Sequence, residues 1–196
     1  MDLATMRARA REDLQDTDAA TYRWTDDEVD GAIERVIKEF SLAYPLQEQD
    51  DIATTDDSRE LDISSLTKKL KVCSVEFPID LEPPYYQRFT EWGDKLYMTD
   101  KGNGDDARVR WDKQHTLDAT TSTIPEQFEE IIVLGSTGYL ATSASVYTVD
   151  RATIAGRHAT INFLKWGQAR LDRYEKKLRA IGRDTRVISK ELYSED

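Results

Sequence analysis

Cysteine and histidine are scarce in this 196-residue sequence, which contains one cysteine, Cys73, and two histidines, His115 and His158. A single cysteine cannot form an intrachain disulfide, which favours synthesis in a reducing compartment. Zinc sites of the Cys/His type and Ser-His-Asp arrangements need more of these residues than the chain provides. We therefore predict no metal site and no catalytic residue of these kinds, and an ordinary packed or surface role for both histidines.

Long hydrophobic runs are also lacking. Residues 1–14 are charged throughout and contain no apolar core of a signal peptide. No other segment approaches the ~20 apolar residues that a membrane-spanning helix needs. The sequence thus predicts a soluble protein that is not exported and has no membrane partner.

Positive charge is limited, because 27 basic residues face 38 acidic ones and the formal net charge is −11. Nucleic-acid binding through phosphate neutralisation requires a basic face, so DNA binding of this kind is not predicted. Residues 153–181 are the exception, with seven basic residues against Asp172 and Glu175. Such a basic element on an acidic protein more often orders an assembly than marks a DNA site.

Four segments have helical patterns. The clearest start is Thr25 followed by Glu28, a capping-box arrangement, and Pro45 ends that segment. Apolar residues at helical spacing predict the other three, and Gly182 is expected to end the last one. The predicted helices cover residues 2–15, 26–44, about 125–148 and about 152–181.

Short segments rich in β-branched and aromatic residues separate the second helix from the third. The predicted strands cover residues 59–63, 71–79, 86–92, 95–99 and 107–117. Within 71–79, alternation places Val72 and Ser74 on one side and Cys73 and Val75 on the other. Residues 101–106, which contain two glycines, are interpreted as a hairpin tip.

Together these elements predict an α+β fold: a mainly α-helical bundle of four helices, with an inserted antiparallel β meander or small sandwich and an extended C-terminal tail. Residues 1–45 and 125–182 form the bundle, 46–124 the β insertion and 183–196 the tail.

Carboxylates are abundant but gather at predicted helix starts, among them Glu28 and Glu126. There they favour the helix dipole, whereas a catalytic acid needs an apolar pocket that raises its pKa. The glycine-containing segment 101–106 lacks the Gly-Lys-Ser/Thr ending of a phosphate-binding loop. We therefore predict no enzymatic activity and no cofactor. The alternatives are a cell-wall or metal-dependent hydrolase that uses these carboxylates, and a cellular helical protein-binding module.

The order of several motifs is informative. Residues 22–40 have the sequence Tyr-Arg-Trp-Thr-Asp-Asp-Glu-Val-Asp-Gly-Ala-Ile-Glu-Arg-Val-Ile-Lys-Glu-Phe, and they are followed by Ser-Arg-Glu-Leu-Asp-Ile at 58–63, Arg-Val-Arg-Trp at 108–111 and Ile-Pro at 124–125. Over roughly residues 1–181, this order resembles the head-to-tail adaptor (head-completion or connector) proteins of tailed bacteriophages. The acidic stretch 48–57 departs from the pattern.

The resemblance implies a structural virion protein that is made in the host cytoplasm and located in the neck of the particle. It implies a helical bundle with a β insertion, assembled as a dodecameric ring beneath the portal that extends the DNA channel and connects the capsid to the tail or neck. The implied partners are the portal protein, neighbouring copies in the ring, the next neck or tail protein, and passing DNA that is not bound sequence-specifically.

Within such a ring, the acidic subunits repel one another, so closure is expected only on the partner. We expect the basic helix to make the subunit contacts, through Arg170, Arg173 and Lys177. The tail is expected to dock on the portal as an extended strand, as the C-terminal arms of related adaptors are thought to do. The residues predicted to dock are Arg186, Val187, Ile188, Leu192 and Tyr193.

Overall fold

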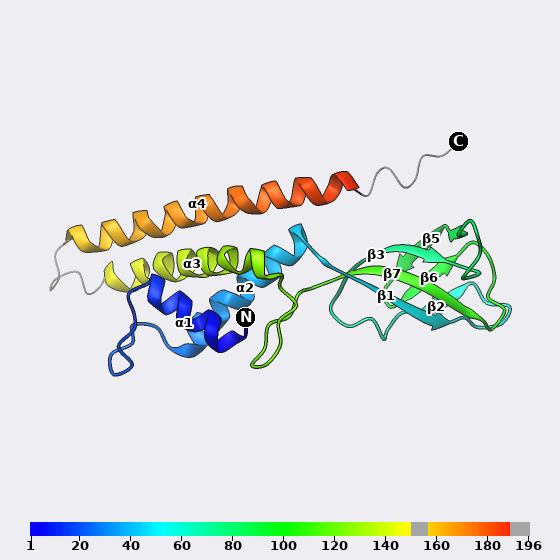
Figure 1. Cartoon of the computed structure of the whole chain (residues 1–196), viewed down its shortest axis with the longest axis horizontal. Helices are drawn as coiled ribbons and strands as arrows, with labels where there is room; N and C mark the ends of the chain where they lie inside the picture. The colour runs from blue at the N-terminus through cyan, green and yellow to red at the C-terminus, as the bar shows by residue number, and fades with distance from the viewer. Residues whose placement is uncertain (150–156, 189–196) are drawn as a thin grey trace. The chain divides into compact units, whose positions relative to one another are not determined.

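The computed structural model describes residues 1–149 and 157–188, with the side chains of 1–144 and 163–183 (Figure 1). Its elements are helices and antiparallel strands, which confirms the α+β class with four α-helices and an inserted β region. The chain divides into two compact units. One contains Met1–Tyr44 and His115–Asp196, and the other contains Pro45–Gln114. Residues 115–124, expected in the β insertion, therefore belong to the helical unit.

The helical unit is built around α3, which packs against each of the other three helices. Residues 131–138 of α3 are all buried, so this helix forms the centre of the unit. Its apolar neighbours on α2 include Val29, Ile33, Val36 and Phe40, which follow the predicted helical spacing. The helices are α1 (Leu3–Asp13), α2 (Asp26–Ala43), the 3-10 turn η1 (Glu126–Phe128), α3 (Glu129–Val149) and α4 (Arg157–Ile188).

The predicted capping box at the start of α2 is present. The Glu28 amide donates to Thr25 Oγ1 at 3.2 Å, and the Thr25 amide donates to Glu28 Oε2 at 2.8 Å. These reciprocal bonds satisfy two backbone donors that have no partner within the helix. The boundary predicted at residue 26 is thereby confirmed.

The predicted end of the last helix at Gly182 is wrong, because α4 continues to Ile188. A Cβ at Gly182 would lie 3.6 Å from the Ala43 Cβ, so this glycine lies where α4 passes the end of α2. Glycine costs only about 1 kcal/mol relative to alanine inside a helix, which packing against a neighbouring helix readily offsets. A Cβ at this distance would be in ordinary van der Waals contact, so neither a helix end nor close packing requires the glycine.

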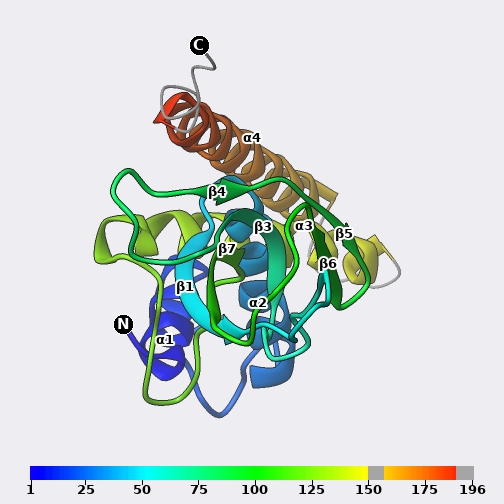
Figure 2. The same ribbon diagram turned by 90° about the vertical axis from the view of Figure 1, so that its right-hand side faces the viewer.

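The β unit consists of two antiparallel sheets around a common core. Figure 2 shows β1, β7 and β3 side by side in one of them. The strand order is β1-β7-β3-β4 in one sheet and β2-β6-β5 in the other. The strands are β1 (Leu46–Ala53), β2 (Glu60–Asp62), β3 (Lys69–Glu76), β4 (Tyr86–Gln87), β5 (Phe89–Trp92), β6 (Lys95–Met98) and β7 (Asp106–Lys113).

Strand β1 was not predicted, because its residues are mostly acidic or amide and lack an apolar alternation. It forms an edge of its sheet and pairs only with β7, from Leu46 opposite Lys113 to Ala53 opposite Asp106. Charged side chains are common on edge strands, because they hinder pairing of the open backbone edge with another chain. The acidic stretch that departs from the adaptor pattern therefore lies largely in this strand.

The predicted alternation in β3 is also interrupted. The register shifts between Val72 and Ser74, so that Val72 lies opposite Trp111 and Val75 opposite Val109. The extra residue leaves Cys73 exposed, and the side chains of both valines point into the same core. A β-bulge of this kind changes the face of every later side chain, which strict alternation cannot anticipate.

The segment 101–106 is not a hairpin tip, because it connects β6 of one sheet to β7 of the other. Gly102 is needed there for space: a Cβ would lie 2.6 Å from the Thr55 carbonyl oxygen. The tight hairpin of this unit is instead at Gly93, where φ is +60° and Trp92 pairs with Lys95.

Candidate functional site: a charged groove in the helical unit

Small residues bring α3 and α4 unusually close together. A Cβ at Gly138 would lie 2.9 Å from the Leu171 side chain, and one at Gly167 would lie 2.9 Å from the Ala141 Cβ. At Gly167 the crowding includes the Thr142 backbone nitrogen at 3.1 Å, so a side chain there would push the helices apart. At Gly138 the Leu171 side chain would have to shift to admit a Cβ.

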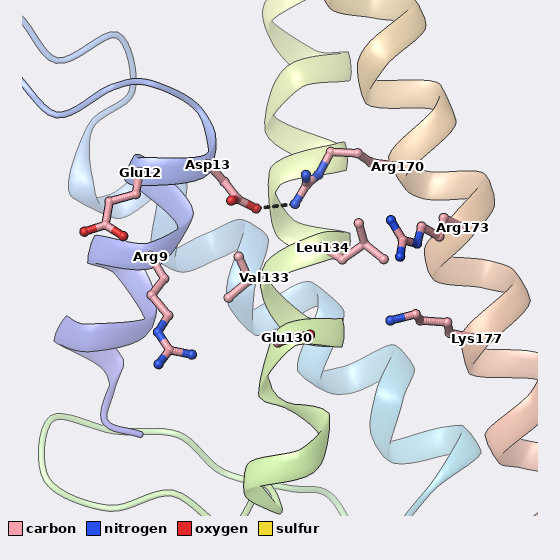
Figure 3. A pocket seen from close by; sticks show the side chains of 9 residues that line it. All are labelled: Arg9, Glu12, Asp13, Glu130, Val133, Leu134, Arg170, Arg173 and Lys177. Carbon is pink, nitrogen blue, oxygen red and sulfur yellow. Dashed lines mark hydrogen bonds and ion pairs between the residues drawn. The ribbon is translucent and has the colours of Figure 1, made fainter.

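A groove of about 360 Å³ opens where α1 lies beside the paired α3 and α4 (Figure 3). Its lining combines four basic, three acidic and two apolar side chains. They are Arg9, Glu12 and Asp13 of α1, Glu130, Val133 and Leu134 of α3, and Arg170, Arg173 and Lys177 of α4. All three residues predicted as subunit contacts therefore line one groove.

Arg170 is engaged within its own chain. Its guanidinium forms an ion pair with Asp13, drawn as the dashed line in Figure 3, and lies 4.7 Å from the centroid of the Trp166 ring. Cation–π contact and ion pairing both hold the side chain between α1 and α4. Arg170 therefore fixes one end of the groove.

Arg173 and Lys177 extend from α4 toward α3 in Figure 3 and differ from Arg170 in their partners. Among the residues that the structure describes, neither has an ion-pair partner, and the same is true of Arg9 on the facing helix. Arg173 is exposed and Lys177 half-buried. The groove thus holds three cations whose charge is not neutralised by a direct ion pair.

The floor of the groove is apolar. Val133 and Leu134 are 7% and 8% exposed, and both come from the central helix. Glu130, one turn before Leu134 on α3, lies near the floor and is exposed. A bound group must therefore offer an apolar side chain to the floor and negative charge to Arg173, Lys177 and Arg9.

The predictions from sequence found only part of this site. The basic residues of α4 were identified from local composition, and their common face follows from spacings of three and four. Arg9, Glu12, Asp13, Val133 and Leu134 carried no signal, since only the packing of α1 beside α3 brings them there. Helical periodicity marked Leu134 as a core residue and gave no indication of an accessible groove.

The carboxylates at helix starts lie where the sequence predicts. Asp26, Asp27 and Glu28 occupy the first turn of α2, and Glu129 and Glu130 the first turn of α3. Some are also paired with arginines of α1. Arg7 donates to both carboxylate oxygens of Asp30, at 2.8 and 2.5 Å, and Arg11 donates to Asp26 at 2.7 Å and to Asp16 at 2.7 Å. These contacts give the acids structural roles in joining α1 to α2.

His115 is packed in the helical core, where it is 2% exposed. Its Nε2 lies 3.0 Å from the Tyr44 carbonyl, and its Nδ1 lies 2.9 Å from the Thr123 carbonyl and 3.1 Å from Thr123 Oγ1. Both ring nitrogens thus face backbone carbonyl oxygens, and a neutral ring, which has one N–H, can donate to only one of the two. Burial lowers the pKa of His115 more than the hydrogen bonds to the two carbonyls raise it, and this keeps the ring neutral. The side chain of His158 lies outside the described residues.

In the described part of the chain, no group of three or more His, Cys, Asp or Glu side chains is placed to hold a metal ion. No helix of that part is long and apolar enough to cross a membrane.

The tail residues predicted to dock on the portal are divided by the structure. Arg186, Val187 and Ile188 belong to α4 and not to a tail that follows it, whereas their docking on the portal as an extended strand stays a prediction. Their helical backbone continues a helix that packs along α3, and this continuation prevails over the β preference of Val and Ile. Leu192 and Tyr193 lie outside the described residues.

No family model matches this chain, and no curated protein matches its sequence.

Proposed function

We propose that this protein is a head-to-tail adaptor of a tailed bacteriophage, a structural protein that forms a ring beneath the portal and connects the capsid to the tail or neck. The observation that carries the proposal is the order of its elements. Two helices precede an antiparallel β unit, and two further helices follow it. This is the architecture that the sequence resemblance implies, with α2 beginning at the Thr25–Glu28 capping box.

The distribution of charge supports an assembly role. Helix α4 contains nine basic and three acidic residues in a chain whose net charge is −11. Arg173 and Lys177 of this helix are unpaired among the described residues and face an accessible groove. Unneutralised cations beside an apolar floor are suited to a protein contact, in which charge sets orientation and apolar burial supplies free energy.

The acidic side chains favour a structural role over hydrolysis. Glu28 caps α2, while Asp26 and Asp30 are ion-paired with Arg7 or Arg11. A catalytic acid for glycosidic cleavage would need an apolar environment that raises its pKa. Asp26 shows the opposite, because the hydrogen bond from Arg11 lowers its pKa.

The proposal is tested with the portal protein encoded by the same genome. The full-length chain and portal are co-expressed, and the purified complex is analysed by native mass spectrometry. We expect a portal-bound ring with the copy number of a dodecamer, and we expect the protein in isolated virions. The proposal is overturned if the chain, with its helix content intact by circular dichroism, neither binds portal nor occurs in virions. Release of fragments from peptidoglycan by the same preparation would then favour a hydrolase.

A further inference from the structure

We infer that the groove lined by Arg173, Lys177 and Leu134 receives the C-terminal segment 189–196 of a second copy of this chain. This deepens the proposed ring assembly and rests on it, because it names the surfaces through which neighbouring subunits would join.

The chemistry of the segment complements that of the groove. Residues 189–196 have the sequence Ser-Lys-Glu-Leu-Tyr-Ser-Glu-Asp, with an apolar pair between Glu191 and Glu195. Around its apolar floor the groove has four basic and three acidic side chains, so its net charge is positive and opposite in sign to that of the acidic segment. Leu192 or Tyr193 would cover Val133 and Leu134, while the flanking carboxylates would approach Arg173 and Lys177.

A segment from the same chain does not reach the floor. Gly135 of α3 lies beside Tyr174 of α4, which places Leu134 level with about that turn of α4. From there to Ile188, the last described residue of α4, the helix extends about 20 Å, at about 1.5 Å per residue. Extended chain from Ile188 spans at most about 14 Å to Leu192 and about 18 Å to Tyr193, and the chain would first have to reverse direction. The occupant must therefore come from another copy.

The contact would be heterologous, since the end of α4 on one copy would meet the groove on the next. Contacts between two different surfaces generate a ring when the rotation closes. Each copy would donate one segment and accept another, so every groove in a closed ring would be filled. Charge attraction at each contact would also offset part of the repulsion between acidic subunits.

The test uses a fluorescently labelled synthetic peptide with the sequence of residues 188–196 and the full-length protein, with binding measured by fluorescence anisotropy at low salt. We expect saturable binding to the wild-type protein. The double variant Arg173→Glu, Lys177→Glu should bind at least about tenfold more weakly, because two attractive charges become repulsive. A peptide in which Glu191 and Glu195 are replaced by Lys should regain affinity for this variant.

The matched control is Lys165→Glu, Lys176→Glu, which changes the same number of charges at exposed positions of α4 outside the groove. Binding to this control should stay within about twofold of wild type at moderate salt, where distant charges are screened. The inference is overturned if wild-type protein does not bind the peptide, or if groove and control variants lose equal affinity.

Binding of the same peptide to the isolated portal, and not to the groove, would also overturn the inference, because the segment would then be the portal-docking arm. Neither result decides the adaptor proposal itself. That proposal depends on ring formation with portal, which is measured separately on the unmodified chain.

Discussion

The two units of this chain are stabilised in different ways, and the difference indicates which surface is available to a partner. The β unit has a network of ion pairs that includes a buried acid: Arg108 bonds Asp51 and Asp80, each at 2.9 Å, and Arg110 bonds the buried Glu76 at 3.0 Å. The helical unit relies on glycine-mediated contact of α3 with α4 and leaves Arg173 and Lys177 unpaired among the described residues. Charged side chains that are paired within a unit offer a partner little to bind. The helical groove, with its unpaired cations, is therefore the stronger candidate for a partner-binding surface.

The largest effect is expected where the β unit loses a buried negative charge that accepts from arginine. Glu76 is 3% exposed and accepts from Arg110, so Glu76→Gln should destabilise the β unit by about 2 kcal/mol in urea unfolding. The control is Glu60→Gln, which removes an exposed pair with Lys95 at 2.5 Å and should cause no measurable change. Equal effects of the two variants would contradict the view that this network is structural.

The close contact of α3 with α4 is tested by adding one methyl group. In Gly138→Ala the new Cβ would lie 2.9 Å from Leu171, and we expect a loss of about 1–2 kcal/mol in the free energy of unfolding. Gly31→Ala is the matched control, because the α2 glycine has nothing within 4 Å of an added Cβ. It should gain about 0.5–1 kcal/mol from helix propensity. If Gly138→Ala also stabilised the protein, the close packing of the two helices would be refuted.

The helical unit should also lose stability in mild acid. Burial lowers the pKa of His115 below its ordinary value of 6.5, so the unfolded chain binds a proton that the folded chain excludes. The stability that depends on a neutral His115 is fully present above pH 6.5 and is lost as the pH falls from that value toward the folded pKa. The free energy of unfolding then decreases by no more than about 1.4 kcal/mol per pH unit. Urea unfolding at pH 7.5, 6.5 and 5.5 measures this slope, and His115→Gln should flatten it relative to wild type.

The smallest expected effect concerns Gly182. Gly182 lies inside α4, and a Cβ added there would lie 3.6 Å from the Ala43 Cβ, which leaves enough room for it. Gly182→Ala should therefore stabilise the helical unit by about 0.5 kcal/mol in thermal or urea unfolding. A glycine that ended the helix in a left-handed conformation would give the opposite sign, since alanine is strained there. Destabilisation would therefore restore the helix end predicted from sequence.

Several elements of the fold were determined by local sequence. Thr25, Glu28 and the apolar spacing that follows defined α2 to within a residue of its observed bounds, because capping and amphipathicity are properties of contiguous residues. The helix at 125–148 was likewise found, with Pro125 before η1 and small residues along α3. For the candidate site, the basic face of α4 followed from the spacing of Arg170, Arg173 and Lys177.

Other features were decided only by tertiary structure. Strand β1 forms because β7 offers it a partner, although its own side chains are mostly polar. The bulge at Cys73 and the continuation of α4 past Gly182 depend on neighbouring elements that local patterns do not contain. The groove exists because α1 lies beside α3 and brings Asp13 to Arg170 across most of the sequence. Local sequence thus fixed the type of most elements, whereas long-range packing decided their limits, their register and the surface that they leave open.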